Sequence, residues 1–235
     1  MIRLSSGIPD VDKKIQGGFP EGEAILITGE PGTGKTIFAI HFLYNACKEG
    51  HKCAMIATEE TPEKIIDHGR SIGLDMEPFV ESKQLTMLRL LEKRVSNVED
   101  KYGNVSMNVS DLNNFKYIIP EDVEVIVLDN LGAFAIGMEL KLFKDKLETL
   151  VYTFSEEKKT SLIIMDATAH ELTHRIAEYS TYGTIRLMTK ENPYTGKMER
   201  FMSIPKMRET EISLELINYT ITGEGIKLLQ PKTNR

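Results

Sequence analysis

The segment at residues 29–36, which reads Gly-Glu-Pro-Gly-Thr-Gly-Lys-Thr, constrains this chain more than any other feature. It matches the pattern G-x-x-x-x-G-K-[ST]. An apolar stretch typical of a strand precedes it at residues 23–27, and a segment follows in which Phe38, Phe42 and Ala46 recur at helical spacing. Phosphate-binding loops are found in this strand, loop, helix context. The segment therefore predicts an α/β fold that binds the phosphates of a nucleotide.

The residues of this loop have separate expected tasks. Its glycines leave room for backbone N–H groups to surround a phosphate, and the helix that follows adds the positive end of its dipole. Lys35 would reach the β- and γ-phosphates, and the hydroxyl of Thr36 would bind Mg²⁺, so we expect ATP and Mg²⁺ as cofactors. The expected nucleotide-binding residues are Gly29, Glu30, Pro31, Gly32, Thr33, Gly34, Lys35, Thr36 and Ile37.

An acid for the metal follows another apolar stretch. Residues 123–128 are a run of Val, Ile and Leu broken only by Glu124, which is typical of a strand covered on both faces. Asp129 comes directly after it, and a carboxylate at the end of such a strand would support the Mg²⁺ that Thr36 binds. Two separated motifs therefore indicate the same site.

A pair of glutamates is the candidate for activating water. Glu59 and Glu60 follow the apolar residues 54–57, so they would lie at the same edge of a parallel sheet as the phosphates. A carboxylate there could orient or deprotonate the attacking water. The alternative is a solvated acidic start to the helix that Pro62 begins. We therefore predict Glu59, Glu60 and Lys35 as the catalytic residues.

The middle of the chain alternates between strand and helix patterns. The further predicted elements are strands at residues 53–58, 84–90 and 161–165 and helices at residues 62–72 and 139–157. Such alternation is typical of a mostly parallel sheet flanked by helices, with ligands at the carboxyl ends of its strands. Residues 91–119 have weak periodicity and predict an irregular or partly helical segment.

The pattern changes after Gly183 to short alternating strands. Turn residues at 192–196 and 222–225 separate them, which predicts antiparallel strands added in the C-terminal third. A length of 235 residues with 41% hydrophobic content is enough for one core. We therefore predict a single α/β domain over residues 1–235.

Charge and composition narrow the expected partners. The formal net charge of -6 argues against a protein coated in nucleic acid, although a local basic groove stays open. No segment approaches the roughly 18 apolar residues of a membrane span, so we expect no membrane partner. The start of the chain lacks a signal-peptide pattern, and Cys47 and Cys53 form no zinc or disulfide framework. We therefore expect a cytoplasmic protein.

Residues 170–174 read His-Glu-Leu-Thr-His and match H-E-x-x-H. On a helix this pattern would set His170 and His174 on one face to bind zinc, with Glu171 as general base. The segment follows the last predicted parallel strand, however, and no clear third ligand is present in the sequence. We therefore expect no zinc site, and we expect the two histidines to form local hydrogen bonds or to contact a partner.

Several segments together resemble the KaiC-like ATPases of the RecA superfamily. They are residues 6–10 with Asp12, residues 17–20, the phosphate-binding loop, and residues 58–62, 123–130 and 206–208. These segments span nearly the whole chain and follow the family's order. The resemblance implies a RecA-like core and an ATPase activity.

The resemblance also implies roles for particular residues. The first glutamate of the family's pair activates water, which here is Glu59. A lysine and an arginine of a late motif act on the γ-phosphate of a neighbouring subunit, which implies Lys206 and Arg208 and a homo-oligomer, either a ring or a filament. In the family a glycine and then a serine or threonine often follow the arginine, whereas this chain has Glu209 and Thr210.

Single-domain archaeal relatives of this kind resemble RadA paralogues. That similarity implies binding of single-stranded DNA and modulation of homologous recombination or repair, with a recombinase or another protein as partner. The loops after Asp129 and Asp166 would face the DNA, and the candidate basic residues are Lys141, Lys144, Lys146 and Arg175. The alternative is a KaiC-like nucleotide-dependent switch that acts on protein partners without nucleic acid, which the net charge of -6 favours.

Overall fold

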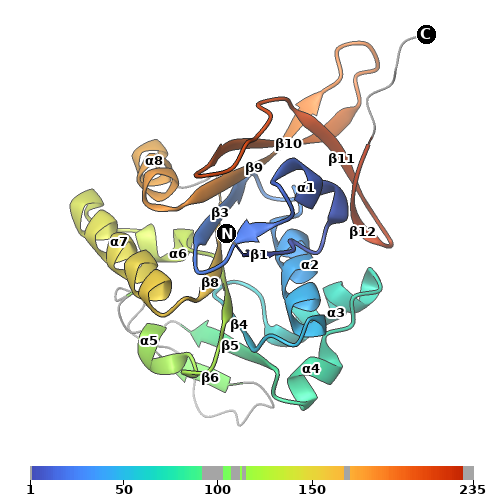
Figure 1. Cartoon of the computed structure of the whole chain (residues 1–235). Helices are drawn as coiled ribbons and strands as arrows, with labels where there is room; N and C mark the ends of the chain where they lie inside the picture. Colours follow the sequence, from blue (N-terminus) through green and yellow to red (C-terminus); the bar gives the residue numbers. More distant parts are fainter. Residues whose placement is uncertain (1, 92–102, 107–111, 113–114, 167–169, 230–235) are drawn as a thin grey trace.

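The computed structural model describes residues 2–91, 103–106, 112, 115–166 and 170–229 of the chain. Among these residues, ten strands form one sheet in the order β12-β11-β10-β9-β3-β8-β7-β4-β5-β6, and β1 pairs with β2 separately (Figure 1). The strands are β1 (Arg3–Leu4), β2 (Phe19–Pro20), β3 (Ala24–Gly29), β4 (Cys53–Ala57), β5 (Leu85–Leu91), β6 (Gly103–Ser106), β7 (Val125–Asp129), β8 (Thr160–Asp166), β9 (Gly183–Glu191), β10 (Met198–Met207), β11 (Ile217–Thr222) and β12 (Gly225–Leu228). The helices are α1 (Pro9–Lys14), α2 (Lys35–Lys48), α3 (Pro62–Ser71), α4 (Glu77–Glu81), α5 (Phe115–Ile118), α6 (Gly132–Ala135), α7 (Leu140–Glu156) and α8 (Glu171–Ser180).

The strands from β9 to β6 in the sheet order run parallel to one another. Their register brings the functional positions level: Gly29 of β3 pairs with Asp166 of β8, and Ala57 of β4 pairs with Asp129 of β7. The ends of these four strands therefore meet at one edge of the sheet, which we call the carboxyl edge. The predicted mostly parallel α/β class is confirmed.

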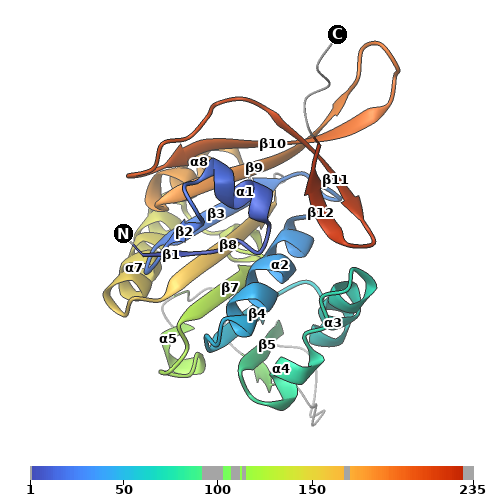
Figure 2. The same cartoon turned by 45° about the vertical axis from the view of Figure 1, so that its right-hand side comes forward.

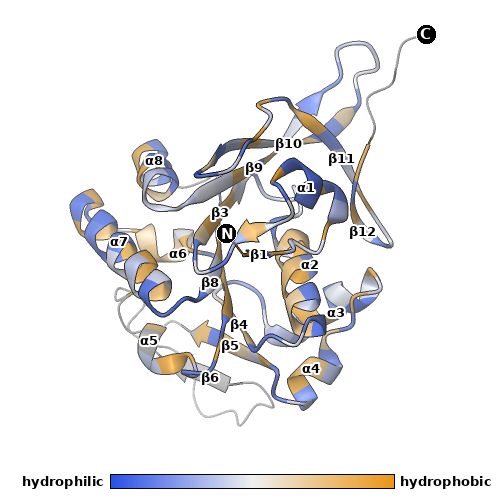
Figure 3. Cartoon of the chain, viewed as in Figure 1, coloured by the Kyte–Doolittle hydropathy of each residue, from blue (hydrophilic) through white to orange (hydrophobic). Residues whose placement is uncertain are grey.

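Helices cover both faces of this sheet (Figure 1). On one face, Phe38 and Phe42 of α2 are fully buried in a core that includes Val127 of β7. On the other face, Phe143 of α7 is buried in a second core that includes Leu128, the next residue of the same strand. Successive strand residues point to opposite faces, so a continuous apolar strand serves both cores (Figure 3).

Strand β9 joins the parallel and antiparallel parts of the sheet. It pairs parallel with β3, where Gly183 lies opposite Ile25, and antiparallel with β10. The prediction of antiparallel pairing after Gly183 is therefore wrong for one side of β9 and confirmed for β10, β11 and β12. The reason is that α8 connects β8 to β9 as a crossover helix, which returns the chain in the parallel direction. The hairpin of β9 and β10 extends beyond the body of the molecule (Figure 2).

The segment at residues 91–119 is partly described. It contains strand β6, which pairs parallel with β5, and the short helix α5. The irregular structure predicted for residues 92–102, 107–111 and 113–114 lies outside the described residues. None of the described helices is long and apolar enough to span a membrane.

Candidate active site

The phosphate-binding loop lies at the carboxyl edge between β3 and α2. The space around it requires glycine: a Cβ on Gly29 would lie 2.2 Å from the carbonyl oxygen of Leu187, and one on Gly34 would lie 2.6 Å from Cδ1 of Ile221. Gly34 also has a φ of 95°, in the left-handed region that favours glycine, and it directly precedes α2. The unpaired N–H groups at the start of α2 therefore open onto the loop, where an anion can bind.

Lys35 is buried, and its ammonium group has three partners. Nζ donates to the carbonyl oxygens of Gly29 at 3.0 Å and Glu30 at 3.1 Å, and it forms an ion pair with Asp166. A charge with an 8% exposed side chain needs such partners, because it has lost most of its hydration. Lys35, which the sequence predicts to contact the phosphates, therefore lies at the loop, where the carboxylate of Asp166 holds its ammonium group.

Thr36 and Asp129, the two residues predicted to bind metal, are in contact. The hydroxyl of Thr36 donates to Oδ2 of Asp129 at 2.8 Å. The pKa of Asp129 is raised to about 6, mainly because burial penalises the charged carboxylate; the hydrogen bond from Thr36 opposes this rise, and the nearby carboxylate of Glu59 contributes to it. A buried carboxylate with a raised pKa is stabilised in its charged form by a nearby positive charge such as a metal ion. Hydroxyl and carboxylate oxygens are also the hard donors that Mg²⁺ takes, so the residues present fit a divalent cation.

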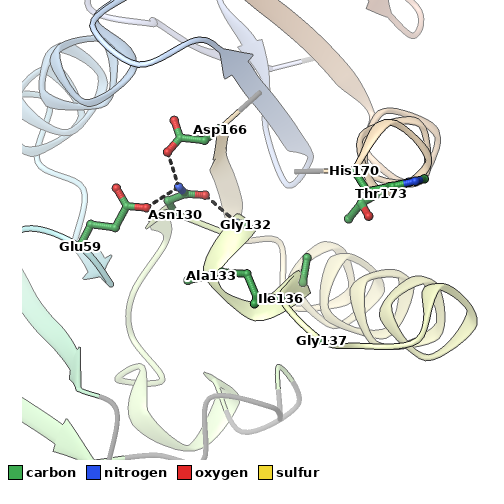
Figure 4. Close-up of a pocket in the computed structure, with 10 residues that line it drawn as sticks. Glu59, Asn130, Gly132, Ala133, Ile136, Gly137, Asp166, His170 and Thr173 are labelled. Atoms are coloured by element: carbon green, nitrogen blue, oxygen red, sulfur yellow. Dashed lines mark hydrogen bonds between the residues drawn. The ribbon is translucent and has the colours of Figure 1, made fainter. Parts of the chain in front are cut away.

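Glu59 is connected to Lys35 through the side chains of Asn130 and Asp166, and Figure 4 shows the part of this network from Glu59 to Asp166. Nδ2 of Asn130 donates to Oε1 of Glu59 at 2.8 Å and to Oδ2 of Asp166 at 2.9 Å. Oδ1 of Asn130 accepts from the N–H of Gly132 at 2.6 Å. Because Asp166 also pairs with Lys35, one continuous network joins the two predicted catalytic residues.

Glu60 has a different neighbour. Its Oε2 lies 3.3 Å from Nδ1 of His68 on α3. The two consecutive glutamates therefore diverge after β4, since Glu59 bonds to Asn130 and Glu60 pairs with α3. The structure thus places Glu59, and not Glu60, in the network that contains Lys35.

A cavity of about 360 Å³ opens beside Glu59 (Figure 4). Its walls come from α6 and α8, and so from the segments that follow β7 and β8. The polar lining includes Glu59, Asn130, Asp166 and Thr173, and the apolar lining includes Ile136. A molecule bound to these two segments would therefore lie next to the carboxyl edge.

The C-terminal strands hold the phosphate-binding loop from outside. The hydroxyl of Tyr219 on β11 donates to the carbonyl oxygen of Thr33 at 2.6 Å. The guanidinium of Arg200 on β10 donates to the carbonyl oxygen of Gly32 at 3.3 Å through its terminal nitrogen. Burial raises the pKa of Tyr219 to about 12, so this hydroxyl stays a donor at neutral pH. Strands far along the chain thus fix the backbone of the loop.

Lys206 and Arg208 are not brought to the loop of their own chain. Lys206 pairs with Thr184 of β9, which pairs with Leu26 of β3, toward the edge opposite Gly29. Leu26 and Gly29 are three positions apart on β3, which is roughly 10 Å of strand. Nζ of Lys206 donates to the carbonyl oxygens at the end of α8, at 2.5 to 3.1 Å. Burial lowers its pKa to about 8. The side chain of Arg208 is exposed.

The histidines of the H-E-x-x-H segment have separate partners. His170 is the N-cap of α8, and its ring accepts from the N–H of Leu172 at 3.3 Å. Nδ1 of His174 lies 3.2 Å from the hydroxyl of Thr28, and its Nε2 lies 2.7 Å from the carbonyl oxygen of Asp166. These are the local hydrogen bonds that the sequence predicts. Within the described part of the chain, no group of three or more His, Cys, Asp or Glu side chains could hold a metal ion.

Sequence reasoning missed Asn130, Asp166 and Tyr219 as residues of the site. The rule that found Asp129, a polar residue directly after a buried strand, also applies to Asp166 and would have found it. Asn130 follows Asp129 and falls under the same rule. Tyr219 had no such signal, because its bond to Thr33 joins residues 186 positions apart.

Comparisons with known proteins give a matching family and several relatives. A family model described as "ATPase: KaiC" matches residues 4–233. A UPF0273 protein of Pyrococcus horikoshii is 26% identical over 231 residues, which cover 95% of this chain and 92% of that protein. A circadian clock protein KaiC2 of a Synechocystis strain is 27% identical over 234 residues, which cover 97% of this chain and 39% of that protein. The chain therefore spans about two fifths of the KaiC2 relative.

A solved structure has the same fold. The crystal structure of a KaiC-like protein from Pyrococcus horikoshii superposes with a TM-score of 0.79 and is 27% identical in sequence. The match covers 97% of this chain and 99% of that one. The likeness therefore includes the C-terminal strands as well as the parallel core.

Proposed function

This chain belongs to the KaiC family of ATPases, and we propose that it is a Mg²⁺-dependent ATPase that works as a nucleotide-dependent switch on a protein partner. The observation that carries the proposal is the meeting of three groups at the carboxyl edge. Lys35 can bind phosphate, Thr36 and Asp129 can hold the metal, and Glu59 can activate water. Phosphoryl transfer from ATP to water needs these parts.

Each group has one task in this proposal. The N–H groups of the loop and of α2 hold the phosphates together with Lys35, which exchanges Asp166 for a phosphate oxygen. Thr36 and Asp129 hold Mg²⁺, which when bound neutralises charge on the phosphate oxygens. Glu59 orients the attacking water or accepts its proton, and the cavity beside it leaves room for that water.

We further propose that a neighbouring copy completes the site, in a ring or a filament. Arg208 is exposed and lies at the edge opposite the loop of its own chain, which supports a contact with the γ-phosphate bound by another chain. A cation delivered there would stabilise the charge of the transition state. Lys206 is tied to the end of α8 and would need to leave three carbonyl oxygens to act in the same way.

The surface near the cavity favours a protein partner. Arg175 pairs with Glu171 at 2.6 Å, and Lys144 lies 3.7 Å from Glu148, so two of the candidate DNA-binding side chains face acids of their own chain. Ile136 is 84% exposed at the rim of the cavity, and an exposed apolar side chain of this size suits a protein contact.

Single-stranded DNA is the second candidate partner. The segments after Asp129 and Asp166 line the cavity beside Glu59, which is the position that DNA-responsive loops would need. A role as a RadA paralogue in recombination or repair, with a recombinase as partner, stays a prediction that rests on this placement. For either partner we propose action in the cytoplasm, where Cys47 and Cys53 stay reduced.

The deciding experiment is ATP turnover with and without single-stranded DNA, measured across a salt series. We expect Mg²⁺-dependent turnover that DNA does not change, and no turnover in a Lys35→Ala control. DNA binding whose affinity falls linearly with salt on logarithmic axes, or stimulation of turnover by DNA, would instead favour the recombination role. Absence of turnover under every condition would overturn the ATPase proposal.

A further inference from the structure

Asn130 is a buried polar residue between two carboxylates. It is 2% exposed, and its single Nδ2 group donates one hydrogen bond to Glu59 and one to Asp166 (Figure 4). An amide nitrogen has two N–H donors, so both are used. Among side chains, only the carboxamides of Asn and Gln offer two N–H donors and an acceptor oxygen in one planar group.

The orientation of this amide is fixed by the backbone. Oδ1 of Asn130 accepts from the N–H of Gly132 at 2.6 Å, so the opposite side of the amide must be the nitrogen. The backbone N–H of Asn130 donates to the hydroxyl of Thr58, the residue before Glu59, at 2.9 Å. The end of β4 and the start of the segment after β7 are therefore held together around the amide.

Glu59 depends on such a partner because its side chain is exposed at the end of a strand. A glutamate there has three rotatable bonds and samples several rotamers unless a bond selects one. The Asn130 bond of 2.8 Å selects one. A general base acts efficiently only when its oxygen is held near the water, and a misplacement of about 1 Å can lower a rate roughly 100-fold.

We propose that Asn130 is a positioning residue for Glu59 and connects it to the state of Lys35. The connection runs through Asp166, which accepts from Asn130 and pairs with Lys35. When phosphate takes Lys35, Asp166 loses its ion pair and keeps its Asn130 bond, so phosphate binding changes the charge next to the amide that holds Glu59. This inference rests on the proposed function, in which Glu59 activates water.

The primary test is Asn130→Ala, assayed for kcat, KM and the Kd of a fluorescent ATP analogue. We expect kcat to fall roughly tenfold to 100-fold while KM and Kd stay within about threefold. The same substitution is then made in a Glu59→Gln background. Because Asn130 acts through Glu59, we expect almost no further loss of kcat there.

A second variant leaves every polar group in place. A Cβ on Gly132 would lie 2.9 Å from Oδ1 of Asn130, at the end of a side chain that can move, so Gly132→Ala should fold and displace the amide. We expect the same loss of kcat, smaller in size. The matched control is Gly223→Ala, because a Cβ there meets nothing within 4 Å, and it should leave kcat unchanged.

The outcomes separate this inference from the proposed function. If Glu59→Gln slows turnover but Asn130→Ala and Gly132→Ala do not, the inference alone is wrong. A loss in the Glu59→Gln background as large as in the wild type would show that Asn130 acts independently of Glu59, which also overturns it. Unchanged turnover in Glu59→Gln itself would overturn the assigned base and this inference with it.

Discussion

The two edges of the parallel sheet carry parts of one proposed reaction but are built differently. At the carboxyl edge, Lys35, Asp166, Asn130 and Glu59 form a network in which each polar group has a partner within its own chain. At the opposite edge, Arg208 directly follows β10, and its exposed side chain has a long hydrogen bond of 3.5 Å to the carbonyl oxygen of Tyr179. One chain thus contains the groups that can bind phosphate, while the guanidinium of Arg208 is exposed to solvent. Under the proposed function, ATP binding therefore belongs to one chain and fast hydrolysis to two.

The largest expected effect is the loss of the carboxyl edge's cation. Lys35→Ala removes the charge that meets the phosphates and leaves Asp166 without its ion pair, so we expect ATP affinity to fall about 100-fold or more and turnover to vanish. Calorimetry with ATP and Mg²⁺ measures the affinity. Lys13→Ala is the matched control, because Lys13 is an exposed lysine that forms an ion pair with Asp10 on α1, away from the phosphate-binding loop. If Lys35→Ala kept its affinity for ATP, the carboxyl edge would not be the phosphate-binding edge of this comparison.

The next largest expected effect is on turnover, and it distinguishes Glu59 from Glu60. Glu59→Gln should lower turnover roughly 100-fold to 1000-fold and leave ATP affinity within about twofold, because the amide keeps the shape but is not a base. Glu60→Gln should have a much smaller effect, since Glu60 faces His68. Single-turnover and equilibrium-binding measurements separate the two quantities. A larger loss in Glu60→Gln would move the base to Glu60.

A smaller effect tests the opposite edge. Arg208→Ala should lower turnover roughly tenfold to 100-fold without changing ATP affinity, and wild-type turnover per chain should rise with protein concentration. Mixing Arg208→Ala with Glu59→Gln should restore part of the activity, because a shared site can then contain one intact residue of each kind. If mixing restores nothing and turnover is independent of concentration, the two edges do not cooperate between chains.

The smallest effect concerns stability and pH. The pKa of Asp129 is raised to about 6 in the folded chain, from an ordinary value of 3.8. At pH values between these two, the folded chain keeps a proton on Asp129 that the unfolded chain has lost. The free energy of unfolding therefore falls as the pH rises through this range. Without metal and nucleotide, Asp129→Asn should therefore be more stable than the wild type by about 1–3 kcal/mol at pH 8 and equal to it below about pH 4. Urea unfolding at both pH values measures this. Asp122→Asn, at an exposed position whose pKa is lowered by Lys52, should show no gain.

The sequence predicted the carboxyl edge better than what surrounds it. The loop at residues 29–36 and Asp129 could be predicted because each follows a buried strand, and the ends of parallel strands meet at one edge. The bonds of Lys206 to the end of α8 could not, because a lysine near an arginine gives no local sign of a helix end packed beside it. The parallel side of β9 was missed for a similar reason, since a strand's partner is a tertiary property that its own residues do not encode.

The support that β11 gives to the phosphate-binding loop has a consequence for how the chain is made. The loop leaves the ribosome early, but Tyr219, which holds it, follows Thr33 by 186 positions. Contacts so distant in sequence form late in folding, because the intervening chain must first be ordered. We therefore expect nascent chains that stop before β11 to contain the whole nucleotide-binding motif and yet bind ATP weakly. Competence to bind would be acquired only after β11 has been made and packed on the parallel core.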